Sequence, residues 1–215
     1  MKPISTSLDH RIIMPESASP GAHPTLVLVH GRGADEEDLV GLARFFDERL
    51  LVLSVRAPFR FEYGGYTWYE AGVDGSPDPG RFSESHDRLS TFLDDALRSY
   101  PVDATRLFLL GFSMGAVMSL AAALTRPMLF RGVSANSGYI AENTPLQYRW
   151  DDLSSLNIFL AHGTEDPVVP VQLGRRARLL LEQSGARLVY REYPMGHEIG
   201  QLSIVDIAGW MSPLL

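Results

Sequence analysis

The chain of 215 residues contains no cysteine. It therefore has no disulfide bond, no zinc site built on cysteine thiolates and no cysteine nucleophile. Its six histidines also lack the paired His-x-x-x-His spacing of helical metal sites. His30, Asp35 and Asp38 lie close together in the sequence, but a turn leading into an acid-rich helix start accounts for them. We therefore expect no metal ion and no other cofactor.

Long apolar runs are missing as well. No stretch approaches the roughly 20 apolar residues that span a bilayer, and residues 1–7 lack the apolar core of a signal peptide. Lysine and arginine number 19 against 26 acidic residues, which gives a formal net charge of −7. This balance argues against nucleic acid as a partner. We expect a cytoplasmic protein without an integral membrane segment.

The distribution of apolar residues predicts one α/β domain over residues 1–215. Hydrophobic residues make up 45% of the chain, enough to bury one large core, and neither a repeat nor a linker divides it. Strand-like and helix-like segments alternate, which favours a mostly parallel sheet with helices on both faces. We predict strands at 26–29, 50–55, 106–110, 132–136, 156–161 and 187–193. We predict helices at 36–48, 85–100, 116–124, 170–184 and 198–211, the last with Ile199, Leu202, Val205 and Ala208 facing inward.

Residues 111–115 read Gly-Phe-Ser-Met-Gly, a G-x-S-x-G pentapeptide between a predicted strand and a predicted helix. A serine at a sharp strand-to-helix turn holds its hydroxyl clear of the backbone. The helix start behind it offers N–H groups and partial positive charge to a developing oxyanion. This context makes Ser113 the candidate nucleophile.

The partners that such a serine needs follow in the order Ser, Asp, His, which is the order of α/β-hydrolases. Asp166 comes just after the strand predicted at 156–161, and His197 comes just after the strand predicted at 187–193. A neutral imidazole takes the serine proton during attack, and a carboxylate holds the imidazole in the required tautomer. We predict Ser113, Asp166 and His197 as the catalytic residues.

Other acids and histidines compete for these roles. Glu165 is the alternative acid, but the Asp166-Pro167 turn favours its neighbour, and Glu198 suits the start of the last helix. His162 ends a strand and is expected to be a packed structural residue. Polar surroundings predict a surface position for the histidines His10, His23 and His86.

A second motif, His-Gly-Arg-Gly at residues 30–33, follows the first predicted strand. The glycines let this loop pass close to a substrate carbonyl. In the α/β-hydrolase arrangement one oxyanion donor is the backbone N–H after the nucleophile, here Met114. The other comes from this loop, here Arg32.

The chain resembles the phospholipase/carboxylesterase family of small α/β-hydrolases, which includes the acyl-protein thioesterases. The resemblance rests on residues 30–35, 111–115, 162–170 and 196–197, together with Trp68-Tyr69. It implies an α/β-hydrolase fold without a large lid, the catalytic residues Ser113, Asp166 and His197, and the oxyanion donors Arg32 and Met114. Many members carry leucine where Arg32 stands, so this chain departs from them at the mouth of the pocket.

An aromatic-rich segment at 59–81 lacks clear periodicity, and long irregular segments are often functional. We predict that Trp68 lines the substrate pocket, and we add Val168 as a second pocket residue. Contact between a guanidinium and an alkyl chain is unfavourable. The presence of Arg32 therefore predicts a preference for substrates with acyl groups of about two to six carbons.

The sequence predicts a serine hydrolase that cleaves a small-molecule carboxylic ester through an acyl-enzyme. A lysophospholipase or an acyl-protein thioesterase is the alternative within the same class. A non-catalytic binding protein of the same fold is the alternative outside it, although a receptor has no need of all three catalytic residues. The oligomeric state stays open, and a homodimer is one option.

Overall fold

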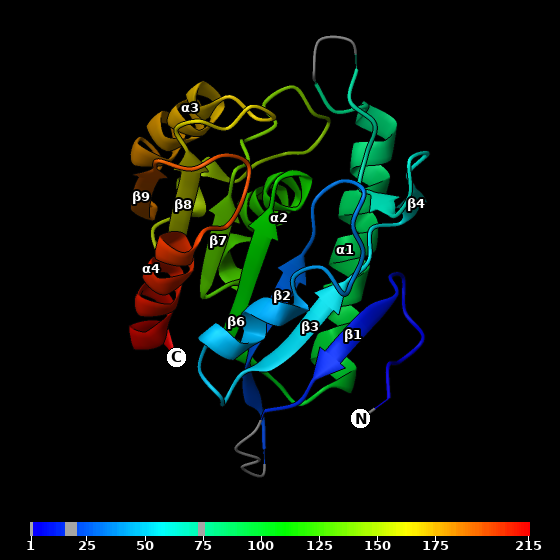
Figure 1. Cartoon of the computed structure of the whole chain (residues 1–215). Coiled ribbons are helices and arrows are strands. Elements are labelled where there is room, and N and C mark those ends of the chain that lie inside the picture. The colour runs from blue at the N-terminus through cyan, green and yellow to red at the C-terminus, as the bar shows by residue number, and fades with distance from the viewer. Residues whose placement is uncertain (1, 16–20, 73–75) are drawn as a thin grey trace.

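Figure 1 shows a computed structural model of the chain, which describes residues 2–15, 21–72 and 76–215. Within these residues seven strands form one sheet in the order β1-β3-β2-β6-β7-β8-β9. They are β1 (His10–Ile13), β2 (His23–Val29), β3 (Leu51–Val55), β6 (Val102–Phe112), β7 (Gly132–Asn136), β8 (Asn157–Gly163) and β9 (Arg187–Tyr193). All neighbouring pairs are parallel except β1 with β3. The carboxyl ends of six strands therefore meet at one edge.

Helices cover both faces of this sheet. The helices are α1 (Pro79–Ser99), α2 (Met114–Thr125), α3 (Val171–Glu182) and α4 (Gln201–Met211), and the longest of the short 3₁₀ helices is η1 (Val40–Phe45). The shorter 3₁₀ helices of the described residues are η2 (Pro127–Leu129), η3 (Trp150–Asp152) and η4 (Ser212–Leu214). A small hairpin joins β4 (Phe59–Arg60) to β5 (Tyr66–Thr67).

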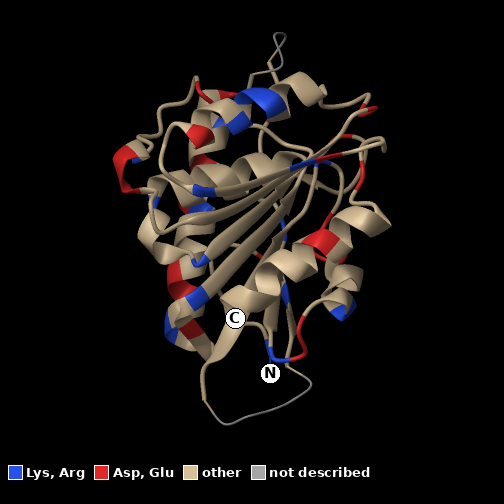
Figure 2. Ribbon diagram, turned by 90° about the vertical axis from the view of Figure 1, so that its left-hand side faces the viewer, with Lys and Arg blue, Asp and Glu red and all other residues tan. Residues whose placement is uncertain are grey.

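Two apolar clusters hold the layers together. One joins α1, α2 and α3 to the sheet face that carries Val27 and Val29. The other joins η1 and α4 to the opposite face, which carries Leu26 and Leu28. Adjacent residues of β2 thus point to opposite faces, as the pleat requires, and both faces are buried. Figure 2 shows the charged residues mainly on the helices and connecting segments around the sheet. The fold class predicted from the sequence is confirmed.

Two predicted helices differ from the structure. Residues 36–39 form turns and only η1 is helical, so the helix predicted at 36–48 is wrong in type and length. The Glu36 side chain forms an ion pair with Arg56 and is buried, so it does not lie on a solvent-facing helix surface. Helix α1 begins at Pro79, six residues before the predicted start, because the Asp78 side chain caps it by accepting from the Arg81 amide at 2.8 Å.

The last helix turns a different face to the core from the one predicted. Helix α4 buries Ser203, Ile204, Ile207 and Met211, whereas Leu202 is 69% and Val205 60% exposed. This helix is apolar nearly all round, so its sequence holds two possible stripes, and contact with the sheet selects one of them. Glu198, which was expected to start this helix, lies before its first residue, Gln201.

The three histidines expected at the surface are buried instead. His10, His23 and His86 are each less than one tenth exposed. His10 lies between the Leu8 carbonyl and the Tyr100 hydroxyl. His86 on α1 is hydrogen-bonded through Nε2 to Thr125 Oγ1 on α2 at 2.8 Å. Long-range partners of this kind cannot be read from the polar neighbours in the sequence.

Burial of these histidines predicts a pH-dependent stability. Burial lowers the pKa of His10 and His86, and also that of His30, so the folded protein keeps them neutral where the unfolded chain is protonated. Stability should therefore fall as pH drops below the unfolded value of about 6.5. Each histidine contributes at most about 1.4 kcal/mol per pH unit in that range. Denaturant unfolding of the wild type and of His86→Gln at several pH values should give a shallower dependence in the variant. Parallel curves for the two proteins would refute the assignment.

Candidate active site

Ser113 stands at the turn between β6 and α2, with a φ of 56° and a ψ of −122°. A positive φ is strained for a residue with a side chain, and it is the mark of a sharp strand-to-helix turn. The turn is held because the Ser113 amide donates to the Asn136 carbonyl on β7 at 2.9 Å. The serine is thereby presented at the carboxyl edge of the sheet.

The two glycines of the pentapeptide are required by close approach. A Cβ on Gly115 would collide with the main-chain oxygens of Val29 and His30 at the end of β2. A Cβ on Gly111 would collide with the Gly115 carbonyl and with Ser119 Oγ. The first turn of α2 can lie this close to β2 and β6 only because both positions lack a side chain.

The structure brings the three predicted catalytic residues together from three separate loops. Ser113 Oγ lies 2.9 Å from His197 Nε2, and His197 Nδ1 lies 2.7 Å from Asp166 Oδ2. Since a carboxylate only accepts, the proton sits on Nδ1, and Nε2 is left to accept from the serine hydroxyl. The ring of Phe112 lies 4.8 Å from the imidazole between centroids and limits its movement.

The Asp166 side chain is fully buried and remains ionised. Burial acts to raise the pKa of Asp166. Hydrogen bonds from His197 and from the amides of Val169 and Val168 outweigh burial and lower the pKa below the ordinary carboxyl value. The two amides donate to Oδ1 at 2.8 and 2.9 Å, which leaves Oδ2 for the imidazole. Glu165, the alternative acid, is exposed to solvent.

His162 supports this loop as a packed residue. Its side chain is fully buried, and Nε2 lies 2.8 Å from the carbonyl oxygen of Val169, to which it can donate. The same nitrogen is 3.6 Å from Asp166 Oδ2. His162 is thus packed in the interior, as expected from the sequence. Its Nε2 also lies near the Asp166 carboxylate.

The His-Gly-Arg-Gly loop lies beside Ser113. A Cβ on Gly31 would be 3.3 Å from the Ser113 Cβ, so the loop passes close to the hydroxyl. In the described part of the chain, the amides of Arg32 and Met114 donate to no other protein group. Two N–H donors without a protein acceptor among the described residues therefore belong to residues that line the same cavity as the serine.

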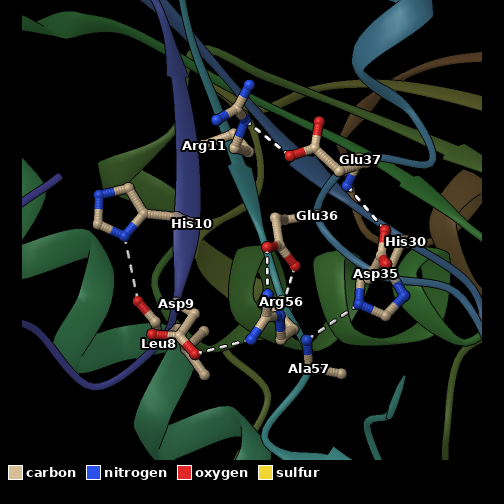
Figure 3. A network of polar contacts seen from close by, with 10 residues as sticks. All are labelled: Leu8, Asp9, His10, Arg11, His30, Asp35, Glu36, Glu37, Arg56 and Ala57. Carbon is tan, nitrogen blue, oxygen red and sulfur yellow. Dashed lines mark hydrogen bonds and ion pairs between the residues drawn. The ribbon is translucent and has the colours of Figure 1, made fainter. Parts of the chain in front are cut away.

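A polar network under this loop fixes its path (Figure 3). The buried ring of His30 accepts from the Ala57 amide at 3.0 Å and donates through Nδ1 to the Gly31 carbonyl at 2.6 Å. Glu36 at the end of the loop pairs with Arg56, which follows β3. Arg56 also pairs with Asp9 at 3.0 Å. The loop is thus tied to the neighbouring strand at both of its ends.

The prediction that Trp68 lines the substrate pocket is wrong. Its side chain is fully buried, and its indole N–H donates to the His30 carbonyl at 2.9 Å. Trp68 therefore supports the loop from behind. An indole has one donor and a large apolar surface, so a buried carbonyl acceptor at the loop explains its position. The adjacent Tyr69 lines the cavity instead.

A cavity of about 590 Å³ opens beside Ser113. Its apolar wall includes Met114, Val117, Ile140 and Leu173. Val168 also lines this cavity and is 54% exposed. The size is in the range of small-molecule sites.

Two further features concern residues 2–15, 21–72 and 76–215. No three histidine or carboxylate side chains among them lie close enough to hold a metal ion together. No helix among them is long and apolar enough to cross a membrane.

The fold and the arrangement around Ser113 define a hydrolase of the α/β class. The chain belongs to the phospholipase/carboxylesterase family, because the model of that family matches residues 10–214. The match includes β1 and the start of β2, which precede the motifs on which the resemblance rests.

Individual relatives agree with this family. The chain is 27% identical over 163 residues to acyl-protein thioesterase 1 of Debaryomyces hansenii, covering 71% of this chain and 70% of that protein. It is 27% identical over 188 residues to the putative hydrolase MhqD of Bacillus subtilis, covering 86% and 90%. Among solved structures, a Bacillus cereus carboxylesterase has a TM-score of 0.84 and 25% identity, covering 97% and 95%. A Mesorhizobium loti carboxylesterase, at 21% identity and a TM-score of 0.85 with 96% and 95% covered, shares the fold.

Proposed function

We propose that this hydrolase cleaves carboxylic esters with short acyl chains through an acyl-enzyme on Ser113. The observation that carries the proposal is the chain of contacts from Ser113 Oγ to His197 at 2.9 Å and from His197 to Asp166 at 2.7 Å. This is the geometry of nucleophile, general base and orienting acid. Family membership supports the same reaction class.

In acylation, Ser113 Oγ attacks the ester carbonyl carbon while His197 Nε2 takes the hydroxyl proton. The carbonyl π electrons move onto oxygen, which becomes an oxyanion. When this intermediate collapses, the bond to the alkoxy group breaks, and the imidazolium returns the proton to the leaving alcohol. Asp166 stays ionised throughout and stabilises the imidazolium, which its lowered pKa favours.

The oxyanion is bound by the amides of Arg32 and Met114, whose donors are not used by other described groups. Donors that are oriented before the reaction need no rearrangement when charge develops. Met114 is the first residue of α2, so the partial positive charge of the helix start adds to its amide.

In deacylation, water replaces the alcohol. His197 removes a proton from the water while the water oxygen attacks the acyl carbon. The imidazolium then gives that proton to Ser113 Oγ as the bond between Oγ and the acyl carbon breaks. The products are a carboxylic acid and the regenerated serine. An acyl-protein thioesterase would use the same steps on a thioester, and relatives of that name make this the second candidate.

We expect a preference for short acyl groups, of about two to six carbons. Arg32 is exposed at the cavity beside Ser113, where a permanent charge disfavours a long alkyl chain. Values of kcat/KM across p-nitrophenyl esters from acetate to palmitate should peak at short chains. In Arg32→Leu the ratio of octanoate to butyrate activity should rise. A wild-type optimum at laurate or longer would overturn the short-chain assignment and favour the thioesterase or lysophospholipase.

A further inference from the structure

Within residues 2–15, 21–72 and 76–215, the cavity beside Ser113 has a positive charge that no acidic side chain lining it balances. Among the residues that the structure describes, the charged side chains that line it are Arg32 and Glu142. Glu142 is already neutralised, because its two oxygens accept from Arg176 Nε at 3.1 Å and from the Arg176 NH2 group at 2.8 Å. This pair lowers the pKa of Glu142, although burial opposes the effect. Asp166 cannot balance Arg32 either, because its side chain is fully buried and hydrogen-bonded to His197.

Arg32 has no carboxylate partner among the residues that the structure describes. Its side chain is exposed and lies over the ring of Phe61, whose centroid is 5.4 Å from the guanidinium carbon. A ring below a guanidinium orients it without neutralising it, and leaves the in-plane N–H groups free to bind a carboxylate.

The β4–β5 hairpin, which carries Phe61, is hydrogen-bonded to the end of the His-Gly-Arg-Gly loop. The Gly33 amide donates to the Tyr66 carbonyl at 2.8 Å, and the Tyr66 amide donates to the Ala34 carbonyl at 2.8 Å. The Tyr63 ring packs edge-on against Phe61, with 5.4 Å between centroids. The Arg32 guanidinium therefore rests on a supported surface, and it belongs to a residue whose backbone amide is proposed to bind the oxyanion.

The tyrosines of the cavity add no negative charge. Tyr69 and Tyr139 both line it. Burial raises the pKa of Tyr69 well above its ordinary value, and burial also raises the pKa of Tyr139. Their hydroxyls stay protonated and offer neutral hydrogen bonds, so the positive charge of Arg32 remains available to a bound molecule.

We propose that the preferred substrates are esters that carry a carboxylate a few bonds from the scissile carbonyl, and that the Arg32 guanidinium binds this carboxylate. The inference rests on the proposed esterase function and names its substrate class. A charge-assisted, two-pronged contact binds a carboxylate and discriminates against a neutral group of the same shape.

The carboxylate can belong to the acid or to the alcohol, and two substrate pairs separate these sources. On the acid side, monoethyl glutarate is compared with ethyl 4-carbamoylbutanoate, its neutral amide. On the alcohol side, 2-carboxyethyl butanoate is compared with 2-carbamoylethyl butanoate. Within each pair size and reactivity are nearly matched, so the ratio of kcat/KM measures recognition of the charge. Hydrolysis is followed by titration of the released acid at constant pH.

We expect the charged member of at least one pair to be favoured about tenfold in the wild type. In Arg32→Gln this ratio should fall to about one, and in Arg32→Lys it should lie between the two. Since each ratio is taken within one variant, any general loss of turnover cancels. Arg44→Gln removes an equal charge from η1 and should keep the wild-type ratio. Added salt should reduce the preference in the wild type.

The outcomes distinguish this inference from the proposed function. Hydrolysis of the neutral esters without any preference for charge, or a preference that survives in Arg32→Gln, overturns the role of Arg32 and leaves the esterase function intact. An equal drop in Arg44→Gln shows a general charge effect and also overturns it. If none of the four esters is hydrolysed, the proposed function fails, and the inference fails with it.

Discussion

Replacing Ser113 with alanine is expected to lower kcat/KM for p-nitrophenyl butyrate by about three orders of magnitude or more. The change removes the only atom that forms the acyl bond, while the two oxyanion amides and the cavity stay in place. The residual activity should be close to that of water attack assisted by these amides. Initial rates with freshly purified protein, corrected for the uncatalysed reaction, provide the measurement.

Ser137→Ala is the matched control for this experiment. Ser137 is also a buried serine with a positive φ, 51°, next to the sheet edge. Its substitution removes the same atom from a similarly strained backbone, and activity should stay within about threefold of the wild type. Equal losses in both variants would point to damage to the fold rather than to a nucleophile at Ser113. Full activity in Ser113→Ala would exclude that serine.

Asp166→Asn is expected to lower turnover by about four orders of magnitude. An amide can donate to His197 Nδ1 and so favour the tautomer with its proton on Nε2, which cannot accept from Ser113. It also lacks the charge that stabilises the imidazolium. In this orientation the Asn oxygen still accepts from the amides of Val168 and Val169, so the fold should be retained, and thermal unfolding measured alongside kcat checks this.

Glu165→Gln provides the comparison. The two carboxylates are adjacent in sequence, but Glu165 is exposed, whereas Asp166 is buried against His197. We expect the Glu165 variant to keep nearly all of its activity. The reverse pattern, with a severe loss in Glu165→Gln and a mild one in Asp166→Asn, would show that the wrong carboxylate had been assigned.

The sheet and the residues around Ser113 were predictable because local patterns determine them. Short apolar runs bounded by turns mark strands that are buried on both faces, and the strand predicted at 187–193 matches β9. The glycines beside Ser113 reflect contacts with the end of β2, so the pentapeptide carries information about packing as well as chemistry. The edge strand β1 was missed, since its four residues lack a comparable apolar run.

Features that depend on distant partners could not be predicted in the same way. Trp68 was assigned to the pocket because aromatic residues often line such sites. In the structure its indole N–H instead donates to the His30 carbonyl, and the ring packs beneath the His-Gly-Arg-Gly loop. The burial of His10 depends on Tyr100, far away in the chain. The inward face of α4 was set by packing, because two apolar stripes competed in its sequence. The charge balance around Arg32 likewise emerged only once the Glu142–Arg176 pair was located.

The most direct test of the account is the position of the adduct formed with an organophosphate ester such as paraoxon. We predict one phosphoryl group per chain, located on Ser113 by peptide mass spectrometry, with loss of activity in proportion to labelling. Ser113→Ala should remain unlabelled. An adduct on a different serine, or an unlabelled wild type that still hydrolyses esters, would contradict a nucleophilic Ser113.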